Sequence, residues 1–390
     1  MEQKIYNEYV EILKEELLPA MGCTEPIAVA YAAAVAVQAL GEKPESVEVN
    51  VSANIIKNVK SVVVPCTGGL RGIGAAVCAG IVAGCPEKEL EILEEITGEQ
   101  KVEMKKMLDT MPMTIRESDK EYIFDIQIKA CAGGHSGYVE IAGFHTNVIC
   151  VKKDDEIIRE KAYEEQGSSC ATDRSLLTVE KIIEFADCVD VADVEEVLQR
   201  QIDYNWAIAE EGMTGNWGAA IGKTLMEAYG NSVHNRAKAM AAAGSDARMN
   251  GCELPVVINS GSGNQGMTTS LPVIVYAKEL NVSKEMMLRA LVVSNLITIH
   301  MKTGIGRLSA YCGAISAGCG AGAGICYLYG GRAYEISHVI VNAVAINSGV
   351  VCDGAKASCA AKIASAVEAG LLGLQMQKNG KQFYGGDGLV

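Results

Sequence analysis

Aromatic residues are scarce in this chain: phenylalanine, tryptophan and tyrosine together make up 5% of its 390 residues. Glycine is abundant, with 41 residues, and alanine fills runs such as residues 27–40. Small side chains let helices approach one another closely, so the composition predicts tight helix packing and argues against an aromatic-rich pocket. The length is enough to bury a large core, and it suggests two domains or one large domain.

Positive charge is also in short supply, because 34 lysines and arginines face 48 acidic residues, for a net charge of −14. Such a surface does not attract nucleic acid or an anionic membrane, so neither is expected as a partner. Acidic runs such as "EKELEILEEITGEQ" are typical of solvated helix faces. An anionic small-molecule substrate would need basic groups placed locally. The sequence leaves the oligomeric state open, a homo-oligomer included.

The first residues, "MEQKIYNEYV", are polar and charged, which argues against a secretory signal and predicts a cytoplasmic protein. Thiols stay reduced there, so we expect the 14 cysteines to be buried fillers, metal ligands or catalytic groups. Residues 308–331 carry no charge, but they are dominated by glycine, alanine and serine. This stretch predicts a buried helix or helix pair in preference to a membrane span.

The pattern of apolar residues changes twice along the chain. Residues 1–42 predict two helices with a break at Cys23. Residues 43–165 predict an α/β subdomain with a mainly antiparallel sheet, whose expected strands include 46–55, 60–65 and 121–132. Residues 166–390 predict a helical domain that would carry the chemistry. The expected fold class is α+β, with the α/β subdomain inserted beside a large, mainly helical domain.

No standard nucleotide or zinc motif is present. The segment "NSGSGNQG" (259–266) lacks the ending of a P-loop and the glycine spacing of a Rossmann motif. It predicts a polar loop running into a helix, whose free N–H groups bind a carboxylate or phosphate. Its candidate substrate-binding residues are Ser260, Ser262, Asn264 and Gln265. A plain flexible connection is the alternative.

Cys23 lies in "PAMGCTEPIA", at the break between the two N-terminal helices. Free backbone N–H groups and the positive end of a helix dipole at such a break favour a thiolate. A small buried filler residue is the competing interpretation.

Three further cysteines, Cys312, Cys352 and Cys359, follow a basic segment that holds Lys302 and Arg307. The Asp353-Gly354 pair predicts a turn, after which a helix begins and Cys352 folds back toward Cys359. Thiolates are the ligands of iron–sulfur clusters. The spacing alone matches no familiar pattern, and Cys319 and Cys326 compete as ligands. The two basic residues are candidates for binding a substrate carboxylate.

His135 follows a predicted strand in the glycine turn "CAGGHSGY", where its side chain could reach a cleft. We therefore include it among the candidate substrate-binding residues, although a structural role is the competing interpretation. The roles of His145 and His300 stay open.

Together, "MGCTEP", "NSGSGNQG", "IHMKTGIGRLSAYCGA" and "CDGAKASCAAK" resemble the L-cysteine desulfidase family, which is related to the α part of the iron–sulfur L-serine dehydratases. The motifs span residues 21–362, so the resemblance covers nearly the whole chain. It implies an oxygen-sensitive [4Fe-4S] enzyme that splits L-cysteine into pyruvate, ammonia and sulfide without pyridoxal phosphate. By matching motif, Cys312, Cys352 and Cys359 would hold three irons and Cys23 would accept a proton. L-serine as the substrate, and a non-catalytic amino-acid or redox sensor, are the alternatives.

Overall fold

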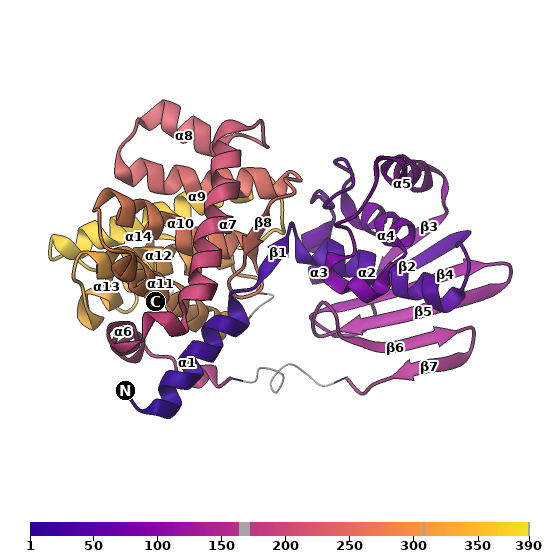
Figure 1. The fold of residues 1–390 in the computed structure, drawn as a ribbon, viewed down its shortest axis with the longest axis horizontal. Coiled ribbons are helices and arrows are strands. Elements are labelled where there is room, and N and C mark those ends of the chain that lie inside the picture. Colours follow the sequence, from indigo (N-terminus) through magenta and orange to yellow (C-terminus); the bar gives the residue numbers. More distant parts are fainter. Residues whose placement is uncertain (164–171, 307–308, 389–390) are drawn as a thin grey trace.

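The structure is a computed structural model that describes residues 1–163, 172–306 and 309–388. Figure 1 shows a helical lobe (residues 3–16 and 174–378) beside a lobe built around one sheet, the sheet lobe (residues 23–160). The predicted α+β class is confirmed. Each lobe has its own large hydrophobic core, one built on Ile12, Phe185 and Leu291 and the other on Val49, Ile126 and Ile141.

The sheet has the strand order β3-β2-β4-β5-β6-β7, and only the β2–β3 pair is parallel. A mainly antiparallel sheet was predicted, and it is confirmed. Along β2, Val47, Val49 and Val51 are buried while Glu48 is exposed, so one face of the strand packs on the core. The strands are β1 (Pro19–Met21), β2 (Ser46–Val51), β3 (Met113–Glu117), β4 (Asp125–Ala132), β5 (His135–Ala142), β6 (Val148–Lys153), β7 (Glu156–Glu160) and β8 (Pro255–Val257).

Helices make up most of the rest. The sheet lobe holds α2 (Thr24–Leu40), α3 (Ala53–Val59), α4 (Gly72–Ala83) and α5 (Gly98–Thr110). The helical lobe holds α1 (Gln3–Glu16), α6 (Val179–Cys188), α7 (Glu195–Thr214), α8 (Ile221–Tyr229), α9 (Val233–Met249), α10 (Gly263–Glu279), α11 (Lys284–Ile305), α12 (Gly313–Leu328), α13 (Ala333–Ile346) and α14 (Cys359–Lys378). Short 3₁₀ turns cover Pro86–Glu91, Arg174–Leu176 and Val191–Asp193.

Small residues bring these helices close together, as the composition predicted. A Cβ atom on Gly80 of α4 would lie 1.9 Å from the carbonyl oxygen of Ala30 in α2. A Cβ atom on Gly318 of α12 would lie 2.3 Å from the carbonyl oxygen of Ala366 in α14. Both distances are far below a permitted contact, so only glycine allows the two pairs of helices to pack at this separation.

The two predicted N-terminal helices contribute to different cores. Tyr9 and Leu13 of α1 are buried in the helical lobe, whereas the alanines of α2 are buried against the sheet. Between them, β1 pairs with β8 of the helical lobe, so the chain crosses between the lobes at this point (Figure 1). The division at residues 42 and 165 stays a prediction.

The predicted strand over residues 60–65 is wrong. Val63 makes a single isolated bridge with Arg71, and Val62, Val63 and Val64 are buried in an irregular segment after α3. A short apolar run does not by itself distinguish a strand from another buried segment.

The uncharged stretch that resembled a membrane span forms α12, whose residues 316–327 are buried inside the helical lobe. Among the described residues, no helix is both long and apolar enough to cross a membrane.

Candidate functional site

A pocket opens between the two lobes and takes residues from both. Its empty space, including the part open to solvent, is about 850 Å³. All four predicted site cysteines line it, together with the predicted loop residues Ser260, Ser262, Asn264 and Gln265 and the predicted cation Lys302. The sheet lobe contributes Cys23, Glu25, Lys57 and Asn58. Residues more than 330 positions apart in the sequence are therefore brought to one place by the meeting of the lobes.

Cys312 and Cys352 are held beside each other by a short pairing of two extended segments. Tyr311 forms an isolated antiparallel bridge with Val351. The N–H of Cys312 donates to the carbonyl of Val350 at 3.1 Å, and the N–H of Cys352 donates to that of Ala310 at 2.8 Å. Side chains alternate along extended backbone, so both cysteines lie on the same side of the pairing. They are diagonal neighbours, a relation that separates Cα atoms by about 7–8 Å.

Cys359 is the first residue of α14, and its Sγ donates to the carbonyl of Gly354 at 3.6 Å. Gly354 has a φ of +95°, and a Cβ atom there would lie 1.9 Å from the backbone oxygen of Lys57 in α3. The turn predicted at Asp353-Gly354, with a helix beginning after it, is confirmed. Only glycine fits at position 354, because this turn lies directly against the sheet lobe.

No three His, Cys, Asp or Glu side chains in the described parts of the chain are arranged to hold a single metal ion. Ligands of one ion crowd within about 2–2.5 Å of it. Ligands of an iron–sulfur cluster bind separate irons and therefore stand further apart. Three thiols on separate segments, two of them diagonal neighbours, fit a cluster better than a single ion.

Cys23 is the N-cap of α2 and is 3% exposed. Burial raises the pKa of its thiol to about 12, while the nearby Arg248 guanidinium acts in the opposite direction. We expected the helix start to favour a thiolate. In this structure, however, loss of hydration outweighs the helix end. Gly22 before it has a φ of +67°, and a Cβ atom there would lie 2.3 Å from Cγ of Pro65, so the approach to Cys23 requires glycine.

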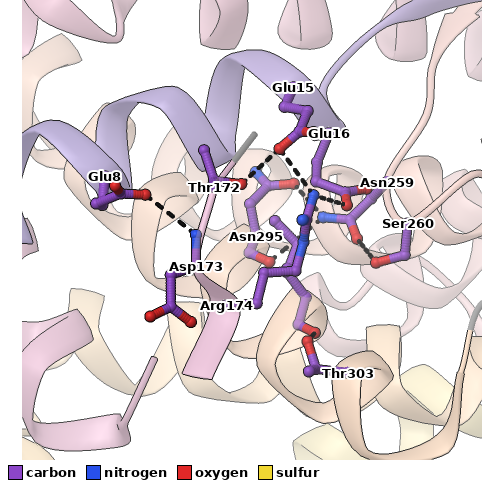
Figure 2. Close-up of polar contacts among 11 residues, drawn as sticks. Glu8, Glu15, Glu16, Thr172, Asp173, Arg174, Asn259, Ser260, Asn295 and Thr303 are labelled. Atoms are coloured by element: carbon purple, nitrogen blue, oxygen red, sulfur yellow. Dashed lines mark hydrogen bonds and ion pairs between the residues drawn. The ribbon is translucent and has the colours of Figure 1, made fainter. Parts of the chain in front are cut away.

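The predicted polar loop runs into α10, which begins at Gly263. Ser260 is 4% exposed and adopts a left-handed φ of +50°, which is uncommon for a residue other than glycine. Figure 2 shows what holds it: its hydroxyl donates to Oδ1 of Asn259 at 2.9 Å, and the Asn259 amide donates to Oδ1 of Asn295 at 2.9 Å. The buried amides give the loop a fixed shape, which does not agree with a plain flexible connection.

The same view shows how the end of α1 is anchored. Arg174 pairs with Glu15 at 3.1 Å and with Glu16 at 2.5 Å (Figure 2). Arg174 is largely buried, so these ion pairs are better shielded from water than surface pairs. They fix the helix immediately before β1, and β1 leads directly to Cys23.

A sequence model of the serine dehydratase alpha chain matches residues 87–390, which is most of the chain. This protein belongs to the serine dehydratase alpha chain family. The matched part contains Cys312, Cys352 and Cys359 and begins after Cys23.

Relatives of this serine dehydratase alpha chain family member match over almost its full length. A UPF0597 protein of Desulfitobacterium hafniense is 58% identical over 389 residues, covering 100% of this chain and 90% of that relative. A UPF0597 protein of Lachnoclostridium phytofermentans is 51% identical, covering 99% and 92%. One of Treponema denticola is 44% identical, covering 100% and 92%. These matches include the segment with Cys23.

Not every predicted site residue of this serine dehydratase alpha chain family member lies in the pocket. Lys302 is 4% exposed near the end of α11 and lines it. Arg307 lies outside the described residues. His135 is exposed at the start of β5, pairs with Asp154 at 3.0 Å and does not line the pocket. Its predicted contact with substrate does not agree with this position, because the β4–β5 turn points into solvent.

The pocket residues that the sequence analysis did not single out include Glu25, Lys57, Asn58 and Arg248. Glu25 follows Cys23 by two positions, and its carboxylate accepts a hydrogen bond from Asn58 Nδ2 at 3.1 Å. Arg248 lies in the last turn of the alanine-rich helix α9 and is 5% exposed. A charged residue inside a run of small buried residues was the available signal, since arginine is almost never fully buried without a reason.

Proposed function

We propose that this protein is an iron–sulfur-dependent lyase that converts L-cysteine and water into pyruvate, ammonia and hydrogen sulfide. Membership of the serine dehydratase alpha chain family suggests the general reaction class, that of a dehydratase-type lyase. The observation that carries the proposal is that the thiols of Cys23, Cys312, Cys352 and Cys359 line one pocket.

In this proposal Cys312, Cys352 and Cys359 hold three irons of a [4Fe-4S] cluster. When bound, the cluster supplies a Lewis acid at the iron that lacks a protein ligand. The three thiols come from a helix N-cap, an extended segment and the first turn of another helix, so they surround the pocket without crowding one point.

The chain itself binds and orients the amino acid and moves its Cα proton. The fixed loop before α10 and the Lys302 ammonium hold the substrate carboxylate. Cys23 takes the proton from Cα as its thiolate, the form that burial disfavours and that the neighbouring Arg248 guanidinium favours. The Cα–H bond breaks, the Cβ–S bond breaks with its electron pair leaving on sulfur, and 2-aminoacrylate forms. Its imine tautomer reacts with water to give pyruvate and ammonia.

L-serine is the second candidate substrate, because the matching family is that of a serine dehydratase alpha chain. The bond that breaks would then be Cβ–O. A non-catalytic sensor that uses the same thiols would bind an amino acid without turning it over.

Purification without oxygen, followed by iron and sulfide analysis and a pyruvate assay, tests the proposal. We expect about four irons per chain, as a [4Fe-4S] cluster requires, and faster pyruvate formation from L-cysteine than from L-serine. Faster turnover of L-serine would select the dehydratase. Cluster-loaded protein that forms no pyruvate from either amino acid would contradict a lyase and favour the sensor.

A further inference from the structure

Arg248 is a buried cation on the pocket wall, and no carboxylate of the described residues forms an ion pair with it. It donates to the carbonyl of Gly22 at 2.8 Å and to Oδ1 of Asn264 at 3.3 Å, and its Nε has no hydrogen-bond partner. A guanidinium has five N–H donors, and burying its charge without an opposite charge is costly. An anion bound from outside the chain would offset this cost.

The surroundings of Arg248 are built for an anion. The guanidinium lies against the start of α10, where a Cβ atom on Gly263 would be 2.5 Å from its Nε. Free N–H groups at this helix end add to its positive potential. The guanidinium and the N–H groups of this helix start therefore lie together on the pocket wall.

The pocket also holds a negative charge, the carboxylate of Glu25, two residues after Cys23. Glu25 is the one carboxylate among the described residues that line the pocket. It is held by Asn58 Nδ2 at 3.1 Å and keeps acceptor positions on both oxygens. Arg248 binds the backbone of Gly22, so a cation and an anion flank Cys23 along the chain. An α-amino acid carries the matching pair of charges on either side of its Cα.

We propose that Arg248 and the start of α10 bind the carboxylate of an α-amino-acid substrate, and that Glu25 binds its ammonium group. The inference rests on the proposed function, and it adds a direction to the bound substrate. An amino acid held at both ends presents its Cα to Cys23, which lies between the two anchors. The competing explanation is that Arg248 serves only as the counter-ion of the Cys23 thiolate.

Two partial analogues of L-cysteine test the two anchors separately. Their binding to the cluster-loaded wild-type protein is compared with their binding to two variants. 3-Mercaptopropionate carries the carboxylate without the amine, and cysteamine carries the amine without the carboxylate. The affinity of each is measured by calorimetry. Arg248→Gln should weaken 3-mercaptopropionate about 10- to 100-fold, the loss typical of a charged hydrogen bond, and leave cysteamine within about twofold. Glu25→Gln should do the reverse. Equal losses for both analogues in either variant would overturn the proposal.

Kinetics distinguish a substrate anchor from a counter-ion. Arg248→Gln should raise KM for L-cysteine about 10- to 100-fold with a smaller change in kcat. Arg236→Gln is the matched control, because Arg236 lies on the same helix but pairs with Glu279 outside the pocket. A variant with normal KM and reduced kcat would show that Arg248 acts on Cys23 alone, and it would overturn the proposal.

Because Arg248 is buried, the folding of Arg248→Gln is checked as well. Should its circular dichroism or iron content differ from wild type, the wild-type protein decides the question with L-cysteine methyl ester, which lacks the negative charge. The ester should bind at least tenfold more weakly than L-cysteine, and equal binding would overturn the proposal. Absence of pyruvate from cluster-loaded wild type would contradict the lyase, yet the analogue affinities would still test the two anchors.

Discussion

Helix α12 presents two contrasting regions. Its N-cap, Cys312, reaches the pocket, whereas Cys319 and Cys326, one and two heptads further on, are 1% exposed inside the helical lobe. Burial raises the pKa of each interior thiol to about 12. The same residue type at a regular spacing therefore occupies two different environments. The difference is that Cys312 lies at a helix end, where a second extended segment brings Cys352 beside it.

The interior region explains why its cysteines do not join the pocket. Cys319 packs with Ala343 and Ala369, and it is flanked by glycines that bring α12 against its neighbours. In this close packing the interior thiols fill space as small apolar groups.

Replacing a pocket thiol should produce the largest effect. Cys359→Ser should lose most of the bound iron and nearly all pyruvate formation, because a serine hydroxyl is a poor ligand for iron of a cluster. Cys319→Ser is the matched control and should keep both. Iron analysis and the pyruvate assay on anaerobic protein measure the outcome. Equal iron loss in the two variants would erase the distinction between the two regions.

Replacing Cys23 should separate proton transfer from cluster binding. Cys23→Ser should keep the iron content of wild type and lower kcat by about 10²–10⁴-fold, the contribution of a positioned general base. Steady-state kinetics and the visible absorption of the cluster report the two quantities. Loss of the cluster in this variant would instead make Cys23 a ligand.

Replacing a cation of the pocket should have an intermediate effect. Lys302→Ala should raise KM for L-cysteine about tenfold, because a charged hydrogen bond to the carboxylate is lost. Iron content should stay unchanged. Normal substrate binding by this variant would remove Lys302 from the proposed site.

A change in the interior region should affect stability alone. Cys319→Ser places a hydroxyl among apolar side chains and should lower the free energy of unfolding by about 1–3 kcal/mol. Denaturant titration, compared with Cys319→Ala, measures this loss. Reduced kcat in properly folded Cys319→Ser protein would show that the interior thiol contributes to the chemistry.

Local signals predicted the features that depend on neighbours in the sequence. The break at Cys23, the loop that leads into α10 and the turn at Gly354 all follow from glycine, proline and polar residues at fixed offsets. The family resemblance supplied the set of cysteines. Periodicity alone did not predict that residues 60–65, after α3, are irregular. A short buried apolar run has the same sequence pattern whether its backbone is a strand or an irregular segment.

The missed residues depend on tertiary packing. Arg248 and Lys57 reach the pocket only because α9 and α3 end at the meeting of the lobes. His135 shows the converse, since a histidine in a glycine turn has the local appearance of a site residue and yet is exposed and lies outside the pocket. Whether a residue reaches the pocket depends on how helices of the two lobes pack together. A short stretch of sequence does not contain that information.

The contact between Gly354 and the Lys57 carbonyl has a consequence for the assembly of the protein in the cell. The segment that carries Cys352 and Cys359 acquires its shape against a helix encoded some 300 residues earlier, so the C-terminal half alone does not form the pocket. The pocket is complete only after both halves have been synthesised and have docked, and a chain truncated at either end would lack part of the pocket wall.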